Sequence, residues 1–155
     1  MSAGQENRGD PSAMGAAARW VQPEAPRPEP TPDDAEFFAA AARGEFVLQC
    51  CPECETTRHP PRPMCPRCHA PGGVWQAASG RGAIYTWTVV HGPTLPAFVD
   101  ELPYIVIDVQ LDEGPHMIGR LRGCTVADVR AGRRVEAVFE PGADGLALIS
   151  WRCVD

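Results

Sequence analysis

The sequence predicts a mainly β protein in which a short N-terminal helix and a cysteine-rich ribbon precede a five-stranded barrel. Three observations lead to this fold class. Two Cys-x-x-Cys pairs lie close together, a segment with helix start and stop signals precedes them, and five segments after them alternate between apolar and polar residues. A chain of 155 residues can hold this arrangement in one domain with a small appendage.

Composition excludes several classes of function. The net charge is −6, and all 14 basic residues are arginine. Without lysine there is no Schiff-base chemistry on this chain and no lysine-dependent phosphate loop. No apolar run approaches the roughly 18 residues of a membrane span. The first residues lack the basic and apolar regions of a signal peptide. We therefore expect a cytoplasmic protein that does not bind membranes.

Residues 1–31 are expected to form a disordered or extended tail. Six of the 17 prolines fall within the first 32 residues, and the segment cannot bury enough apolar surface to offset the entropy of ordering it. Trp20 and Val21 are its only sizeable apolar pair. The tail is either a passive linker or a short docking segment.

A helix is predicted within residues 32–45. Thr31 and Asp34 match a capping box, and the helix body carries Phe37 and Phe38 side by side. Adjacent helix residues point about 100° apart. One phenylalanine can therefore pack on its own domain while the other faces a partner protein. The alternative is that the helix packs wholly on its own domain.

Residues 46–76 contain two cysteine pairs of the same form. Cys51 and Cys54 enclose Pro-Glu, and Cys65 and Cys68 enclose Pro-Arg. Each spacing lets a tight turn present two thiolates to one ion, and two such turns complete a tetrahedral site that suits zinc and also iron. Four protein ligands close the site, so we expect a structural ion. The alternative is a ribbon that keeps its cysteines without metal.

The other cysteines and the nearby histidines are expected to be bystanders. Cys50 adjoins the first proposed ligand and could replace it, but it would break the identical spacing of the two pairs. His59 and His69 are expected to be exposed. Cys124 and Cys153 are expected to pack as small apolar groups in the barrel.

Residues 77–155 are predicted to form the barrel. Alternation of apolar and polar residues, rich in Val, Ile, Thr and aromatics, indicates five strands. A hairpin turn is predicted after the second, and a short helical turn before the fourth. Such a sequence suits a small Greek-key barrel of the OB type. The predicted strands are 80–92, 104–111, 116–123, 133–140 and 146–153.

The sequence contains no motif for a self-sufficient active site, and we assign no catalytic residues. His91 and Asp108 are the only candidates for acid–base work, and each is expected to be a surface residue. From Asp33 onward the chain has 11 arginines and 16 acidic residues, and this negative net charge argues against nucleic acid as a partner. Arg120 and Arg122, and the adjacent Arg133 and Arg134, could meet phosphates, but a solvated barrel face is the commoner explanation for such arginines.

Together these motifs resemble the Domain-of-Unknown-Function-35 family. The resemblance rests on C-P-x-C…P-P-R-P-x-C-P-x-C, on S-G-R-G-A-I-Y-T-W-T-V-V-H, and on L-P-Y-I-V followed by L-D-E-G-P-H-M-I-G, and it covers residues 33–155. It implies a rubredoxin-like zinc ribbon joined to an OB-fold, with one structural zinc per chain held by the four cysteines. In the family a glycine often follows the second cysteine of each pair. Here Glu55 and His69 stand at these positions, which we expect to strain the turns.

The resemblance also implies a function. Family members are partners of thiolase-fold enzymes that act on acyl-CoA thioesters, so this chain would be an accessory subunit in a hetero-oligomer with a thiolase-like enzyme of the lipid-transfer-protein type. The helix with Phe37 and Phe38 would face that partner, and the barrel would help to enclose the acyl-CoA; the CoA-binding residues stay unassigned. The first expectation is a steroid side-chain (retro-)aldolase complex. Alternatives are an acetoacetyl-CoA or C-acyltransferase complex, an independent acyl-CoA hydrolase, and a nucleic-acid-binding module.

Overall fold

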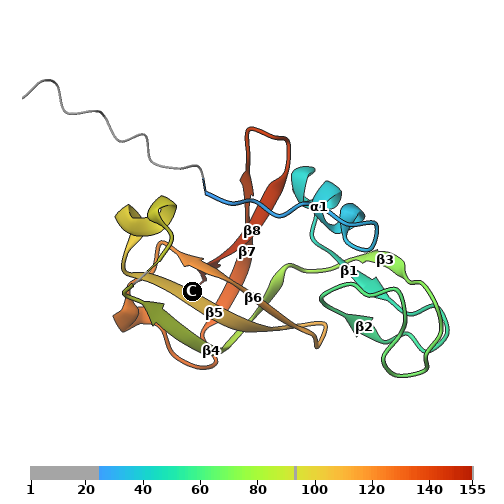
Figure 1. The fold of residues 1–155 in the computed structure, drawn as a ribbon. Coiled ribbons are helices and arrows are strands. Elements are labelled where there is room, and N and C mark those ends of the chain that lie inside the picture. Colours follow the sequence, from blue (N-terminus) through green and yellow to red (C-terminus); the bar gives the residue numbers. More distant parts are fainter. Residues whose placement is uncertain (1–24, 93, 155) are drawn as a thin grey trace, which may run out of the picture.

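The computed structural model describes residues 25–92 and 94–154, and Figure 1 shows how their elements are arranged. One α-helix precedes three short strands and five longer ones, with two 3₁₀ segments between the longer strands. In chain order the elements are α1 (Ala35–Ala42), β1 (Val47–Cys50), β2 (Thr57–Arg58), β3 (Val74–Ala77), β4 (Arg81–Val90), η2 (Pro96–Glu101), β5 (Tyr104–Leu111), β6 (His116–Arg122), η3 (Val126–Asp128), β7 (Arg134–Pro141) and β8 (Ala147–Cys153).

The ribbon is built on a three-stranded antiparallel sheet in the order β2-β1-β3. Gln49 lies in the central strand, opposite Arg58 on one side and Trp75 on the other. The sequence did not indicate these strands, because segments of two to four residues are too short to show a period.

The five longer strands form a closed barrel in the order β4-β5-β6-β8-β7. Neighbouring strands are antiparallel except β6 and β8, which run parallel and pair at Leu121 with Trp151 and at Arg122 with Arg152. The fold class predicted from the sequence is confirmed: the protein is mainly β, with one helix, a ribbon and a five-stranded barrel of the OB type. Each predicted barrel strand matches an observed one within two residues at either end.

The inward face of β5 shows why the alternation was informative. Ile105, Ile107, Val109 and Leu111 are buried, with at most 5% of each residue exposed. Side chains of a strand point alternately to its two faces, so one face fills the barrel while the other meets solvent.

The helix α1 is shorter than the predicted span. It begins at Ala35, because Thr31 and Asp34 close a separate turn before it. The Asp34 carboxylate accepts hydrogen bonds from the backbone N–H of Thr31 and from its hydroxyl, which lies 2.9 Å away. At the other end Gly44 adopts a left-handed φ of +76°, as expected for the residue that terminates a helix.

Part of the predicted tail is described. Residues 25–31 have no regular structure, but Arg27 donates to the Asp144 carboxylate at 2.8 Å and to the carbonyl of Leu146 at 2.5 Å. This contact with the β7–β8 hairpin differs from the expectation of a free tail. Residues 1–24, including Trp20 and Val21, lie outside the described residues.

One apolar core joins the helix, the ribbon and the barrel. Phe37 of α1 and Leu48 of β1 belong to the same buried cluster as the inward face of the barrel, which centres on the fully buried Trp151. Phe46 belongs to the same cluster, and its ring centroid lies 6.1 Å from that of Trp151. The ribbon and helix are therefore packed on the barrel and do not hang from it, as Figure 1 shows for α1 beside β7 and β8.

Candidate metal centre and adjoining cavity

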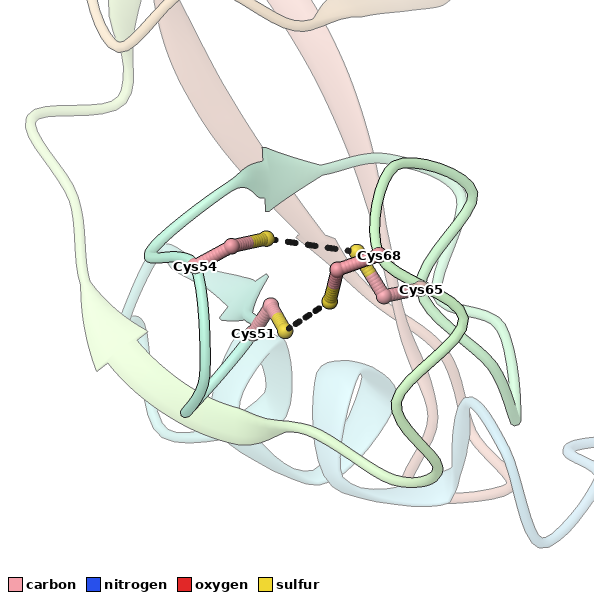
Figure 2. Close-up of side chains that lie close together, drawn as sticks. All are labelled: Cys51, Cys54, Cys65 and Cys68. Carbon is pink, nitrogen blue, oxygen red and sulfur yellow. Dashed lines mark hydrogen bonds between the residues drawn. The ribbon is translucent and has the colours of Figure 1, made fainter.

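The ribbon brings the four cysteines of the two predicted pairs together. Their sulfurs all lie within 4.8 Å of one another, and Figure 2 shows them converging from two turns. The Sγ atoms of Cys51 and Cys68 are 3.5 Å apart, and those of Cys54 and Cys65 are 3.6 Å apart. Within the described residues this is the one group of at least three potential ligands that could hold a metal ion.

The geometry of the cluster fits a tetrahedral ion. In a zinc–tetrathiolate site with Zn–S bonds of about 2.3 Å, neighbouring sulfurs lie about 3.8 Å apart. The observed sulfur–sulfur distances are close to this value. The donor set of four soft thiolates also excludes calcium and magnesium, which take oxygen ligands. Such an ion would cross-link the two turns, and these cysteines would be its four ligands.

The two turns have the same backbone pattern. In the first, the N–H of Glu55 donates to the carbonyl of Cys51 at 2.9 Å; in the second, the N–H of His69 donates to the carbonyl of Cys65 at 3.0 Å. Glu55 and His69 both adopt left-handed φ angles, of 58° and 62°. Residues with a Cβ atom are strained in this region. The sequence-based expectation of strain at these two positions is thus supported by the backbone.

Hydrogen bonds within the turns also favour the thiolate forms of Cys54 and Cys65. The hydroxyl and the backbone N–H of Thr56 lower the pKa of the Cys54 thiol to about 6, and the hydroxyl lies 3.1 Å from the sulfur. Backbone N–H groups at Cys68 and Arg67 lower the pKa of Cys65. Hydrogen bonds to the charged form favour that form, so these two sulfurs are ready to bind a cation.

The residues near the cluster are placed as follows. Cys50 is buried but directs its sulfur to the carbonyl of Cys51, outside the cluster, so the preference for Cys51 agrees with the geometry. His69 is exposed, as expected. The expectation for His59 is wrong: its ring is half-buried against Phe37 at 5.2 Å between centroids, and burial lowers its pKa. The helix covers this histidine, which the local sequence could not indicate.

The two adjacent phenylalanines of α1 have different surroundings. Phe37 is only 7% exposed and belongs to the core, whereas Phe38 is half-buried at the edge of that core. Their rings meet edge to face at 5.5 Å. Both line a cavity of about 580 Å³.

This cavity lies where the helix, the ribbon and the barrel meet. The helix contributes the two phenylalanines, the ribbon contributes His59, Pro60 and Pro61, and the barrel strands β6 and β8 form the floor. Most of the wall is apolar. Its apolar lining includes Pro26, Phe37, Phe38, Pro60, Pro61, Phe98, Met117, Leu148 and Ile149.

The polar end of the cavity is an ion-pair network. Arg120 pairs with Glu101 at 2.9 Å and stacks over the Tyr104 ring at 4.2 Å. Arg122 pairs with Glu101 at 3.0 Å and with Glu140 at 2.7 Å. The two arginines that could have met phosphates are thus matched by two carboxylates. The contribution of Glu101 was not predicted, because it comes from η2, a segment without periodicity.

The candidate acid–base residues are separate from both sites. His91 is exposed at the end of β4. Asp108 instead meets His116, whose Nδ1 lies 3.1 Å from its carboxylate, and the His116 ring packs on Tyr85 at 4.8 Å. The sequence did not predict this cluster, since the pairing of β5 with β6 creates it.

Two barrel cysteines were expected to pack as separate apolar groups. The structure corrects this: Cys124 and Cys153 form a disulfide with their Cα atoms 6.6 Å apart. They follow β6 and end β8, and the parallel pairing of these strands brings them together. Residues 29 positions apart show no local sign of such pairing.

Comparison with known proteins agrees with this architecture. Residues 38–72 match the family described as "ChsH2, rubredoxin-like zinc ribbon domain", and residues 75–140 match "ChsH2, C-terminal OB-fold domain". A "DUF35 domain-containing scaffold protein" of Methanocaldococcus jannaschii is 34% identical over 107 residues, which are 66% of this chain and 75% of that protein. The chain belongs to the DUF35 family. The cysteine cluster therefore lies in a rubredoxin-like zinc ribbon domain, and the barrel is an OB-fold.

Two further proteins are similar to it. A chain of the solved structure titled "Ltp2-ChsH2(DUF35) aldolase" shares 35% identity and a TM-score of 0.74, over 82% of this chain and 98% of that chain. A "Probable enoyl-CoA hydratase alpha subunit" of Thermomonospora curvata is 39% identical over 110 residues, which are 71% of this chain. The match spans only 34% of that longer protein. No helix in the described part of the DUF35 chain is long and apolar enough to cross a membrane.

Proposed function

We propose that this DUF35 chain is a non-catalytic accessory subunit of a thiolase-fold acyl-CoA enzyme, and most specifically of a steroid side-chain (retro-)aldolase. In this role it stabilises the partner and helps to enclose the CoA thioester. The observation that carries the proposal is the 35% identity with the DUF35 chain of an aldolase, over 98% of that chain. Nucleophile and acid–base groups would belong to the partner.

The cavity beside α1 supports a role in enclosing the substrate. Its apolar walls and volume of about 580 Å³ suit the acyl portion of a thioester, as ligand cavities of roughly 300–1,000 Å³ usually do. The phosphates of CoA would find no unpaired arginine at the polar end, because Arg120 and Arg122 are matched by Glu101 and Glu140. We therefore assign the acyl portion to this cavity and the nucleotide portion to the partner. The same ion pairs support the expectation that nucleic acid is not a ligand.

The surface around Phe38 is the proposed contact with the partner. Phe37 is buried and holds the helix on the core, so its side chain offers little area to another protein. Phe38 lies at the rim of the cavity and remains half-exposed. A partner that covers this rim would complete the burial of Phe38 and close the cavity in one step.

The metal in this proposal is one structural zinc per chain. It would be held by the four clustered cysteines, and its role is to keep the ribbon folded under the helix. The ribbon loop between the cysteine pairs supplies Pro60 and Pro61 to the cavity wall. Zinc would therefore support the substrate cavity without taking part in chemistry.

A second candidate is a subunit of an acetoacetyl-CoA or C-acyltransferase complex. The archaeal relative is named a scaffold protein and not an aldolase subunit, so its name is compatible with this candidate. The two candidates share the cavity and the thiolase-like partner. They differ in the reaction that the complex performs.

Co-expression with thiolase-like proteins tests both candidates. We expect a stable complex in size-exclusion chromatography and retro-aldol cleavage of a steroid side-chain acyl-CoA by the complex alone. Acyl transfer without cleavage would favour the second candidate, and no co-elution with any thiolase-like protein would contradict both. Phe38→Asp should weaken assembly, while Val126→Asp, at an exposed position away from the cavity, should leave it unchanged.

A further inference from the structure

One strand pair of the barrel, β6 with β8, is short and parallel. Strands β6 and β8 run parallel and pair at Leu121 with Trp151 and at Arg122 with Arg152, whereas β5 and β7 hold their neighbours by longer antiparallel ladders. Parallel pairing is slightly less stable per residue than antiparallel pairing. This short parallel pair joins β4, β5 and β6 to β7 and β8 in the closed barrel, and we call it the seam.

A disulfide lies directly beyond this seam. Cys124 follows the end of β6 and Cys153 ends β8, so their bond continues the strand pair where backbone pairing stops. Both residues are only half-buried. Small thiols and disulfides in solution can therefore reach the two sulfurs, in contrast to Cys50, Cys51 and Cys65, which are buried in the ribbon.

The surroundings of the bond carry charges of both signs. A hollow of about 380 Å³ lies over it, and Arg122, Arg133 and Arg152 line this hollow together with Asp128. The Asp128 carboxylate is engaged by the Thr125 hydroxyl at 2.6 Å, and Glu140 and Glu136 pair with Arg122 and Arg152 from outside the lining. Arg122 and Arg152 are thus matched by carboxylates, so the hollow gives small thiols and disulfides access to the bond without selecting them by charge.

We propose that Cys124 and Cys153 form a reversible redox site that exchanges with small disulfides and thiols and thereby locks or releases the barrel seam. The proposal is independent of the proposed function, since neither cysteine lines the cavity beside α1. In the dithiol form one protein thiolate attacks a small disulfide and expels one small thiolate. The second protein thiolate then attacks the mixed disulfide and expels the other. Two protein thiols are oxidised to one disulfide, and one small disulfide is reduced to two thiols.

The consequence of the exchange is a change in local stability. Cross-linking residues 29 positions apart restricts the unfolded chain and favours the closed barrel by on the order of a hundredfold in the folding equilibrium. The dithiol form should open most readily at the seam, which frees η3 and the C-terminal residues. Hydrogen exchange of the backbone amides of β6 and β8 near the seam would then be faster in the dithiol form than in the disulfide form.

The test is a thiol count across glutathione buffers of defined redox ratio. The full-length zinc-loaded protein is equilibrated, quenched in acid, denatured with chelator and alkylated, and its intact mass is measured. We expect a transition from seven alkylated cysteines to five as the buffer becomes oxidising, with the unlabelled pair mapped to Cys124 and Cys153.

Matched variants make the result decisive. Cys124→Ser should abolish the transition and leave Cys153 as a mixed disulfide with glutathione, whereas Cys50→Ser should keep the transition. Seven labelled thiols at every redox ratio, or a native disulfide that no thiol reduces, would overturn the proposal. So would a disulfide mapped to the ribbon cysteines.

Discussion

The Arg58 guanidinium donates a hydrogen bond from Nε to the Oε1 atom of Gln49 across the β1–β2 pair, at 2.6 Å. Both side chains are buried, and the same Gln49 oxygen accepts the backbone N–H of Arg62 at 2.9 Å. Arg58 also donates to the carbonyl of Gly72. Gln49 thus ties β1 and β2 to the loop between the cysteine pairs.

Gln49→Leu should destabilise the protein by about 2–3 kcal/mol, because it leaves the Nε–H group of Arg58 and the Arg62 amide without their acceptor in a buried site. Denaturant unfolding of the metal-loaded protein measures the effect. Gln76→Leu is the matched control, since it makes the same change at an exposed position of the neighbouring strand. Equal losses in the two variants would contradict the importance of the buried contact.

Glu55→Gly and His69→Gly should each stabilise the ribbon by about 1 kcal/mol, because glycine adopts the observed left-handed φ without a Cβ penalty. The measurement is the midpoint of unfolding together with the rate of metal loss to a chelator. Glu53→Gly in the same turn lacks a left-handed φ and should be neutral or destabilising. Stabilisation by all three variants would indicate an effect other than relief of strain.

Cys54→Ser should lower the metal content well below one ion per chain and destabilise the ribbon. Elemental analysis of the purified protein gives the stoichiometry and identity of the metal, for which we expect zinc. Cys50→Ser leaves all four clustered sulfurs in place and should keep the metal. A metal-free wild-type protein with a fully folded ribbon would contradict the predicted role.

Stability should fall in acid partly through Glu140. The Arg122 guanidinium holds the pKa of this carboxyl below its ordinary value of 4.5. A carboxyl whose pKa is lower in the folded state contributes stability above its unfolded pKa and loses it as the pH falls through the folded pKa. Glu140→Gln should therefore flatten the pH dependence of stability below about pH 4.5. Metal release in acid affects wild type and variant alike, so the difference between their curves is the informative quantity.

Gly119→Ala should destabilise the barrel by about 1–3 kcal/mol, because a Cβ atom there would lie 2.7 Å from the Trp151 indole. Trp151→Phe removes atoms at this contact, so the second substitution should cost less in the alanine background than alone. Thermal unfolding of the four proteins of this cycle gives the coupling. Strict additivity would place the strain elsewhere.

The sequence predicted what regular periods and fixed spacings encode. The alternating residues of β5 predicted both its bounds and its buried face, and the two Cys-x-x-Cys pairs predicted the cluster of four cysteines. It could not predict features created by tertiary pairing, such as the disulfide at the β6–β8 seam or the meeting of His116 with Asp108. In β4 a register shift between Ile84 and Thr86 breaks the alternation, so strict period-two reasoning misassigns the residues after it.

The loop between the cysteine pairs takes part in two sites. His59, Pro60 and Pro61 of this loop line the cavity, and the cysteine pairs at its two ends form the candidate metal cluster. Any ligand that orders this loop therefore also favours the arrangement that binds the ion. Thermodynamic linkage requires the effect to be mutual: a cavity ligand would raise the affinity for the metal by the same factor by which the metal raises the affinity for that ligand. Substrate supply and metal supply would then act on the same folding equilibrium.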